Sequence, residues 1–509
     1  MALLDEVFKM ALTIEEIGKL IDNDKASEKK KLAKKGLNYY EGLHDIKDYK
    51  MYYVDGDGKL QEDKLRSNVK IPHPFFTELV DQQVQYMLSS DEPFVLSAKS
   101  DDTLQDALND YFDDDFKAEL QECLTGCISK GFENMYAYKS ASGRSRFMTA
   151  DSMGVIEVRG KDTDDGCDYV IYYYPDRIDK GRKVITRIQV WDANTTTYYV
   201  QVSNGKIALD ESQLINPRPH ITYTKTNDDA LYYEGNGGYG FIPFFRLDNN
   251  RKQTSGLAAV KALIDDYDLM ACGLSNNLQD IGEGLYVVKG FQGADLDEMI
   301  QNIRVKKHIG VDADGGVDIK TIDIPYEARK VKLELDEKNI YRFGMGFNSA
   351  QLGDGNITNI VIKSRYALLD LKCNKLEIRL KQFLRQLLKV VLAEINEEFE
   401  SDYQMKDVKI VFEREVMTNA QDNAQIELTD AQKQNQQINT LMVAANLLDD
   451  ETILKAICEI LDIDYDEVKA RLDKQAEEQP ETQVQQVQTQ LNNVTPDDEG
   501  GDGSEQTTD

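Results

Sequence analysis

The chain has 509 residues and a formal net charge of −31, from 91 Asp and Glu residues against 60 Lys and Arg. This length exceeds one compact core and indicates roughly three to four folded units. A protein that grips nucleic acid normally carries a basic face, so the charge favours either no contact with DNA or a contact that stays loose. A third interpretation, that the charge only confers solubility, stays open.

The six cysteines and four histidines are scattered along the chain. This spacing is typical of reduced thiols in a protein made in a cytoplasm, and it argues against a metal site built on histidines. The N-terminus lacks the apolar centre of a signal peptide, and no stretch approaches the roughly 20 apolar residues that span a bilayer. We therefore expect a soluble protein without membrane contact, metal or cofactor.

Residues 1–131 are predicted to be mainly helical, with clear helical spacing of apolar residues over 74–90. Cys123 and Cys127 lie four residues apart on a predicted helix and are expected in the core. The lysine-rich segment 29–35 (KKKLAKK) has two interpretations: a solvated helix face, or a contact with a protein partner or DNA.

Residues 132–247 have a different composition, rich in Tyr, Val, Thr and Ile. Apolar and polar residues alternate in VITRIQVW and TTTYYVQV, and turn sequences such as SNGK and ASGR separate these runs. The pattern predicts an antiparallel β region, with Trp191 in its core.

Residues 256–281 carry apolar side chains at alternating three- and four-residue steps. This spacing predicts a helix with a narrow apolar seam, suited to packing against another helix. The seam comprises Leu257, Val260, Ile264, Tyr267, Ala271, Leu274, Leu278 and Ile281.

A short insertion follows, and a second helix is predicted after it over 326–343. Within the insertion we expect a strand at LYVVKG, a short helix at ADLDEMIQNIR, and a hairpin that turns at DADGG. The acidic turn is similar to a calcium loop, but it lacks the full ligand spacing and the terminal Glu.

Residues 344–359 (GMGFNSAQLGDGNITN) have no periodicity and predict a loop, which leads into a long helix over 360–399. Within that helix, residues 363–389 hold eight basic residues against two acidic ones, a net +6 in an acidic chain. These side chains either pair with acidic neighbours in adjacent subunits or border a passage for DNA.

The C-terminal part is predicted to contain a strand at 407–414 and a helical unit at 430–475. From 476 onward the chain is acidic, with no Lys or Arg and few apolar residues, and is expected to be disordered.

Motifs for common catalytic chemistry are absent from the sequence. There is no GxxxxGK[ST] phosphate loop, HExxH, GxSxG or CxxC. Without a means of hydrolysing nucleotides, any work on DNA needs an external motor. We therefore expect a protein that is not an enzyme; an acidic hydrolase using two carboxylates is the alternative of another class.

Several segments, in this order, resemble the portal (head–tail connector) proteins of tailed bacteriophages, particularly those of siphophages with Gram-positive hosts. The similar segments are YYEGLHDI (39–46), NVKIPHPFFTELVDQQVQYMLS (68–89), FIPFFRLDNNRKQTSGLAAVKALIDDYDLM (241–270) and EARKVKLELDEKNIYRFGMG (327–346). The resemblance spans roughly residues 35–475.

The resemblance implies an α+β ring subunit with a wing, a two-helix stem, a small α/β clip and a helical crown. The implied divisions are an N-terminal helical and β-rich wing region (1–255), stem helix (256–282), clip (283–325), returning stem helix (326–346), tunnel loop (347–359), long wing helix and strand (360–429), crown (430–475) and disordered acidic tail (476–509).

It also implies the partners and the location. About twelve copies would form the ring at one vertex of the capsid in the virion, after assembly in the host cytoplasm. The ring would pass double-stranded DNA without sequence preference, and it would meet the terminase large subunit, the head-completion adaptor, and the major capsid and scaffolding proteins. Another structural head–tail connector or head-assembly protein without a DNA channel is the alternative.

Three groups of site residues follow from the resemblance. The tunnel loop and adjacent helix would face DNA through Asn348, Gln351, Asn356, Thr358, Asn359, Lys363 and Arg365, although Asp354 puts a negative charge in the same loop. The clip would dock partners through Gln301, Arg304, Lys306, Lys307 and His308. The stem would pack through Val260, Ile264, Tyr267, Leu274 and Leu278.

Overall fold

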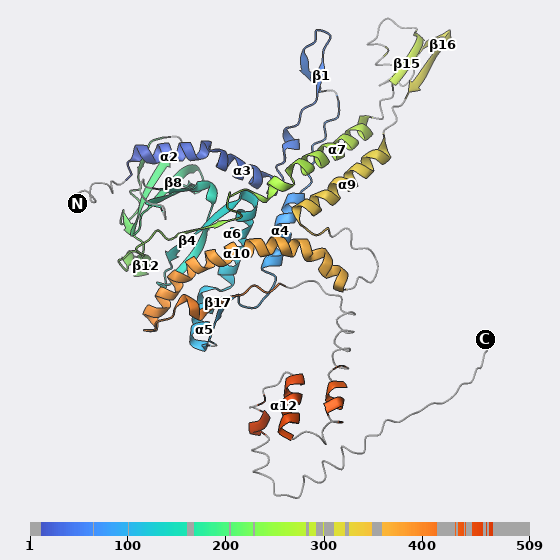
Figure 1. Cartoon of the computed structure of the whole chain (residues 1–509). Helices are drawn as coiled ribbons and strands as arrows, with labels where there is room; N and C mark the ends of the chain where they lie inside the picture. Colours follow the sequence, from blue (N-terminus) through green and yellow to red (C-terminus); the bar gives the residue numbers. More distant parts are fainter. Residues whose placement is uncertain are drawn as a thin grey trace, which may run out of the picture. The chain divides into compact units, whose positions relative to one another are not determined.

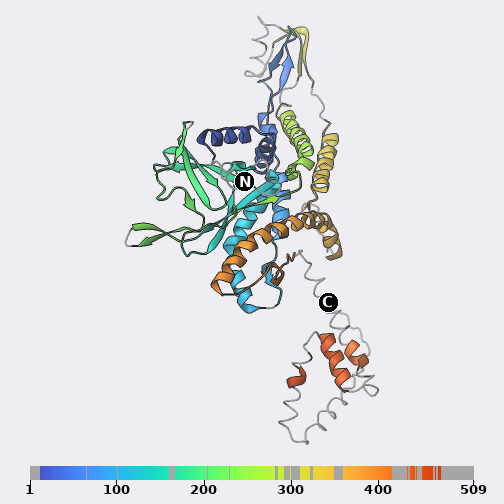
Figure 2. The same cartoon turned by 60° about the vertical axis from the view of Figure 1, so that its left-hand side comes forward.

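The computed structural model describes residues 12–64, 66–99, 101–159, 167–202, 205–227, 230–280, 285–291, 299, 310–320, 325–348, 359–414, 433, 436–441, 443, 450–461, 465 and 468–471. The chain forms two compact units. One comprises residues 1–356 and 360–417, and the other comprises 357–359 and 418–509. The first unit is α+β and holds most of the described elements (Figures 1 and 2).

Most described helices of the N-terminal part begin at polar capping residues, whereas α4 begins after Pro74 without a side-chain cap. Thr13 forms a capping box with Glu16, and the side chains of Ser27, Asp101 and Asp113 each accept a backbone N–H at a helix start. The helices are α2 (Ile14–Ala26), α3 (Glu28–Tyr40), α4 (Phe75–Met87), α5 (Asp102–Tyr111) and α6 (Asp114–Lys130).

The expectation that residues 1–131 are mainly helical misses three short strands. β1 (Tyr52–Val54) and β2 (Leu60–Glu62) form an antiparallel hairpin, and β3 (Val95–Ser97) pairs with β17 (Val408–Ile410), far away in the sequence. Each has only three residues, too few for alternation to be distinguished from chance.

The lysine-rich segment 29–35 is only partly a solvated face. Lys30 is buried: its Nζ lies 3.0 Å from the carbonyl oxygen of Val155 and 3.2 Å from Asp24. The ammonium of Lys29 lies 3.9 Å from the ring centre of Phe132. Burial lowers the pKa of both lysines. Part of this basic segment therefore fastens α3 to the β region.

The β region is antiparallel, as predicted. Five strands follow the order β10-β9-β8-β7-β6, and β11 pairs with β9; a second sheet has the order β14-β4-β5, and β12 pairs with β13. The bounds are β4 (Phe132–Lys139), β5 (Ser145–Ala150), β6 (Val155–Val158), β7 (Tyr169–Ile178), β8 (Lys183–Trp191), β9 (Thr195–Val202), β10 (Ile207–Leu209), β11 (Arg218–Pro219), β12 (Tyr223–Asn227), β13 (Ala230–Glu234) and β14 (Phe244–Asp248).

One helix, α10 (Asn359–Glu398), supplies much of the main core. Its 40 residues correspond to about 60 Å of helix, and Figure 1 shows it curved across α4 and α6. The buried side chains recur at steps of three and four, as predicted. They include Leu369, Cys373, Leu376, Leu380, Phe383, Leu387 and Val391, in one cluster with Cys123 and Cys127.

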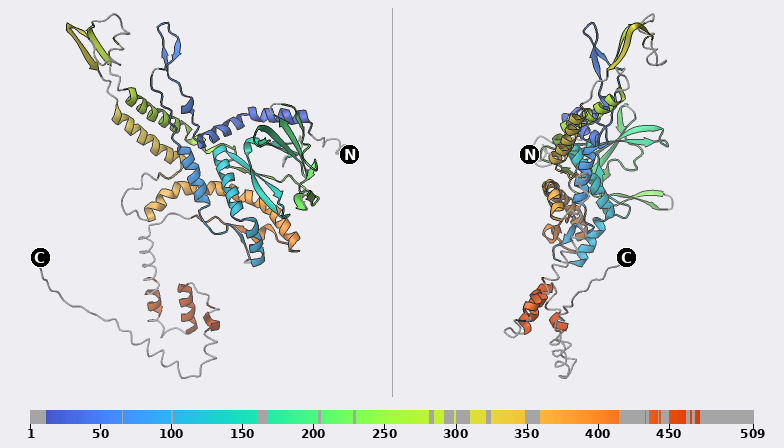
Figure 3. Two further views of the ribbon diagram at one scale, coloured as in Figure 1. Left: turned by 180° about the vertical axis from the view of Figure 1, so that it is seen from behind. Right: turned by 90° about the vertical axis from the view of Figure 1, so that its right-hand side faces the viewer.

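Two helices, α7 (Lys261–Asp280) and α9 (Tyr326–Gly344), pack against each other at the positions predicted for the seamed pair. A 3-10 turn (Gly256–Ala259) precedes α7, so the regular helix begins five residues later than expected. Lys332 of α9 forms ion pairs with Asp266 of α7 and with Asp336. Figures 1 and 3 show the two helices side by side from opposite directions.

The segment 67–73 runs along the polar side of α7 and is bonded to it at every second residue. The Ser67, Val69, Ile71 and His73 N–H groups donate to side chains of Asp280, Asn276, Cys272 and Asp268, at 3.3, 2.6, 3.3 and 2.9 Å respectively. Two residues of extended chain advance about 6.6 Å and four residues of helix about 6 Å, so the two repeats stay in register over this length.

Asp268 is the most enclosed partner in this ladder, with no exposed surface. Its carboxylate lies 2.6 Å from Nδ1 of His44 and 2.8 Å from Nδ1 of His73, and it also accepts the His73 N–H. Burial tends to raise the pKa of Asp268, but these hydrogen bonds outweigh it and leave the pKa below its ordinary value. His44 stacks on Tyr39 at 4.5 Å.

The insertion between α7 and α9 contains β15 (Leu285–Phe291) and β16 (Val311–Lys320), paired antiparallel. The predicted turn at DADGG is wrong: those residues lie within β16, and the register shifts between Lys289 and Phe291, opposite them. Glycine and aspartate there mark a bulge instead of a turn. The predicted short helix lies almost entirely outside the described residues.

In the second unit the structure describes α12 (Asp450–Leu461) and a few neighbouring helical residues. They fall within the predicted helical unit 430–475. The acidic tail from 476 lies outside the described residues.

We predict that Asp268→Asn lowers the free energy of unfolding by about 3 kcal/mol, because two imidazoles and a backbone N–H lose a buried charged acceptor. Asp266→Asn, at a half-exposed ion pair with Lys332, is the matched control and should cost less than about 1 kcal/mol. Urea denaturation measures both.

The same substitution has a defined pH dependence. The folded pKa of Asp268 is depressed, so its stabilisation is present above the unfolded pKa, about 4, and is lost as pH falls through the folded value. The stability gap between the unmodified protein and Asp268→Asn should therefore shrink below about pH 4. A gap independent of pH would contradict the assignment.

Candidate functional site at the base of the 347–359 loop

The segment predicted to be a loop leaves α9 through a sharp turn that is held against α4. α9 ends at Gly344, and Met345 adopts a left-handed conformation with φ of 54°. Gly344 and Gly346 lie directly on the side chain of Leu79, where a Cβ at either position would collide. Glycine is therefore required on both sides of Met345 for the chain to approach α4 this closely.

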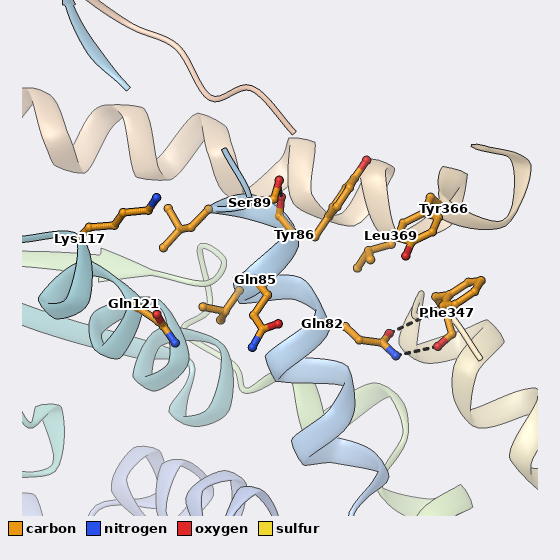
Figure 4. A pocket seen from close by; sticks show the side chains of 11 residues that line it. Gln82, Gln85, Tyr86, Ser89, Lys117, Gln121, Phe347, Tyr366 and Leu369 are labelled. Atoms are coloured by element: carbon orange, nitrogen blue, oxygen red, sulfur yellow. Dashed lines mark hydrogen bonds between the residues drawn. The ribbon is translucent and has the colours of Figure 1, made fainter. Parts of the chain in front are cut away.

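Gln82 of α4 holds the first residue of the loop with two hydrogen bonds. Its Nε2 donates to the carbonyl oxygen of Phe347 at 2.7 Å, and its Oε1 accepts the Phe347 N–H at 2.9 Å (Figure 4). Nε2 also donates to Glu78 at 2.9 Å. The amide thus imitates a strand partner and fixes the direction in which the chain leaves the body.

An aromatic contact joins the first residue of the loop to the helix that follows the loop. The ring of Phe347 stacks on Tyr366 of α10, with 4.9 Å between centroids and 16° between planes. Tyr86 of α4 lies 5.5 Å from the same tyrosine. Phe347 is therefore held by both α4 and α10. We call Gln82, Tyr86, Phe347 and Tyr366 the loop base.

A cavity of about 490 Å³ adjoins the loop base. Figure 4 shows Gln85, Ser89, Lys117 and Gln121 along it, together with the loop-base residues. Lys117 donates to the carbonyl oxygen of Ser90 at 2.8 Å. Amides, aromatic rings, the Ser89 hydroxyl and one lysine provide hydrogen bonds and stacking along this cavity.

Burial and nearby charge govern the titrating groups around this site. Burial and a hydrogen bond to Glu78 raise the pKa of Tyr341 far above its ordinary value. Burial lowers the pKa of Lys372 on α10 to about 8. Among the described residues, no group of three or more His, Cys, Asp or Glu is placed to hold a metal ion.

Of the residues predicted to face DNA, only Asn348 has a described side chain. Its amide donates to Oε1 of Glu337 at 2.8 Å, so this amide helps to fasten the start of the loop. Gln351, Asn356 and Thr358 lie outside the described residues. Asn359, Lys363 and Arg365 fall in the first turns of α10, where the structure describes the backbone alone.

The residues predicted to dock partners, Gln301, Arg304, Lys306, Lys307 and His308, also lie outside the described residues.

The predicted seam on α7 divides into two parts. Val260 and Ile264 are buried in the chain's own core, which corrects the idea that the whole seam must wait for a second copy. Tyr267 is half-buried and packs edge-on against His73 and Phe75. Leu274 is half-buried, and Leu278 is 59% exposed. The unsatisfied part is therefore the C-terminal half of the helix.

The sequence interpretation missed the loop base. Gln82 has no distinguishing sequence signal, because a glutamine on an amphipathic helix is ordinarily solvated. The Gly344-Met345-Gly346 step and the aromatic residues at 347 and 366 were visible signals, since they flank the loop on both sides.

The arrangement is that of a structural subunit that displays an anchored loop. Residues 19–482 match the family described as phage portal protein, SPP1 Gp6-like. The chain is 28% identical over 353 residues to the portal protein of Bacillus phage SPP1, across 69% of this chain and 67% of that protein. It is 25% identical over 433 residues to the portal protein of Clostridium phage phiCD119, across 82% and 89%. The chain therefore belongs to the SPP1 Gp6-like family of phage portal proteins.

Membership confirms the predicted class of function. Portal proteins are structural components of the virion that form a homo-oligomeric ring, the channel for packaging and ejecting DNA, on which terminase docks. Both relatives come from phages of Gram-positive hosts, as the resemblance indicated. None of the helices in the described ranges is long and apolar enough to cross a membrane.

We predict that Gln82→Ala loosens the loop base, because the Phe347 N–H and C=O lose both partners, at a cost of about 1.5 kcal/mol. Amide hydrogen exchange at Phe347 should then accelerate by about tenfold in native conditions. Gln85→Ala, which removes an amide lining the same cavity, is the matched control. Equal exchange rates at Phe347 in the two variants would contradict the assigned role of Gln82 in holding the loop.

Proposed function

We propose that twelve copies of this chain close a ring around DNA, with α7 and α9 as its stem, residues 283–325 as its clip and 347–359 as its tunnel loop. The observation that carries this proposal, beyond family membership, is the apolar surface left open on the paired helices. Leu278 is 59% exposed, Val331 60% and Leu335 51%. A helix pair with apolar residues on its outer faces requires further partners, and a closed ring supplies them from neighbouring copies.

The negative net charge of the chain suits a channel through which DNA passes. Twelve chains of −31 carry 12 × −31 = −372 charges, and such a field discourages DNA from adhering to the walls. Against that background, Lys363 and Arg365 at the start of α10 would offer weak contacts to phosphate without sequence preference. DNA would then slide instead of binding.

The loop base gives the tunnel loop a fixed anchor. The first residue of the loop, Phe347, stacks on Tyr366 of α10, whose buried residues run through the main core. A displacement of the loop by moving DNA would therefore reach α4 through Gln82 and α10 through Tyr366. The loop would act as a tethered unit.

The remaining partners follow from the same assignment. Gln301, Arg304, Lys306, Lys307 and His308 of the clip would meet the terminase large subunit and later the head-completion adaptor, and the outer body would meet the capsid and scaffolding proteins. A head–tail connector without a DNA channel is the alternative. End-on electron micrographs of the purified protein separate the two, because a portal has a central channel.

We expect Leu335→Asp to weaken the ring, because each copy would place a carboxylate in an apolar contact at a cost of several kcal/mol. Mass photometry should show the unmodified protein near twelve times the 57.9 kDa subunit and the variant shifted to smaller species. Val184→Asp, equally exposed at 51% on β8, is the control and should keep the ring. An intact Leu335→Asp ring would remove α9 from the interface.

Deleting residues 351–356 should leave ring assembly intact, because both loop anchors remain, yet reduce DNA packaging or retention. Nuclease-protected DNA per capsid measures the effect. Normal packaging by the deletion variant would exclude the loop from the mechanism.

A further inference from the structure

The β1–β2 hairpin displays apolar side chains that its own chain leaves uncovered. All six of its paired residues are exposed, and Tyr52, Val54 and Leu60 have exposed fractions of 54%, 65% and 66%. The register pairs Val54 with Leu60 and Tyr52 with Glu62. Because directly opposed residues share a side of a sheet, Tyr52, Val54 and Leu60 lie on one face, which is apolar except for Glu62. An isolated two-stranded hairpin is at best marginally stable in water, so we expect another protein surface to pack on this one.

The ladder along α7 fixes where the hairpin lies. The segment that follows β2 joins α7 at its last residue, where the Ser67 hydroxyl lies 2.6 Å from Asp280. The segment that precedes β1 is bonded to the segment 67–73, because Asn68 and Lys70 donate to the carbonyl oxygens of Tyr49 and Lys47. The hairpin therefore extends beyond the C-terminal end of α7.

The strand β15 begins at that same end of α7, so the hairpin and the β15–β16 pair project from one end of the helix pair (Figures 1 and 3). Both are short two-stranded ribbons. On β16, Asp314 and Asp318 are exposed.

Charge favours contact between these two ribbons. Residues 47–70 carry six basic and five acidic residues, a net +1 in a chain of −31. Lys59 and Lys64 in this segment are exposed, whereas β16 has three aspartates and one lysine. Copies that repel over most of their surface can approach here without a like-charge penalty.

We propose that in the ring the β1–β2 hairpin of each copy packs against the β15–β16 ribbon of the neighbouring copy. The proposal rests on the proposed ring. A heterologous contact of this kind repeats identically around a closed ring. The exposed tyrosine and apolar face suits the core of a protein interface, with Lys59 and Lys64 opposite the aspartates of β16 at its rim.

Site-specific photocrosslinking tests this contact in the full-length assembled protein. With Leu60 replaced by benzoyl-phenylalanine, irradiation of the purified ring should give a ladder of multiples of the 57.9 kDa chain on denaturing gels. Peptide mapping should place the links in residues 285–320, and mixed isotope-labelled rings should show that they join different copies. The same probe at Val184, which is exposed on β8, is the control and should give no such ladder.

A second variant tests the chemistry of the contact. Val54→Asp, combined with the probe at Leu60, should abolish the ladder while mass photometry still shows a ring held by α7 and α9. An unchanged ladder would contradict an apolar contact at this face.

The outcomes separate the two proposals. Intact rings whose hairpin links only within its own chain, or only to an added adaptor or terminase, would overturn the contact between copies and leave the ring standing. Absence of a ring in the unmodified protein would overturn the proposed ring itself.

Discussion

The buried carboxylate of Asp268 is the constraint on which the placement of the segment 67–73 along α7 depends. One side chain accepts hydrogen bonds from two histidines that come from different segments of the chain, and it accepts a backbone N–H as well. Such a buried charge is tolerated only with all its partners present. It therefore selects a single register between α7 and the segment 67–73. This register in turn positions the β1–β2 hairpin beyond the C-terminal end of α7.

A small number of contacts also holds the start of the 347–359 loop. One glutamine and one aromatic contact hold Phe347, the first residue of the loop, against α4 and α10. Because Tyr366 lies on the helix that fills the core, the anchor is as stable as the core itself.

The acidic charge and the exposed apolar residues of α7 and α9 would act together in the proposed ring. In the proposed ring, like charges would keep DNA from adhering, whereas the exposed side chains of Val331, Leu335 and Leu278 would supply attraction where neighbours meet. Attraction is therefore concentrated on a few apolar surfaces, while repulsion is spread over the whole molecule. Family membership and this distribution of charge and apolar surface support the same role.

The sequence by itself determined the long helices, the antiparallel β region and the family, because periodicity and capping act within a few residues of each other. The turn expected at DADGG was wrong, since those residues form a bulge within β16, where Gly316 pairs with Lys289 of β15. Only the tertiary structure decided that Lys30 is buried, that Gln82 grips Phe347, and that half of the α7 seam is covered within the chain. Those outcomes depend on contacts between residues far apart in sequence, for which spacing along the chain carries no signal.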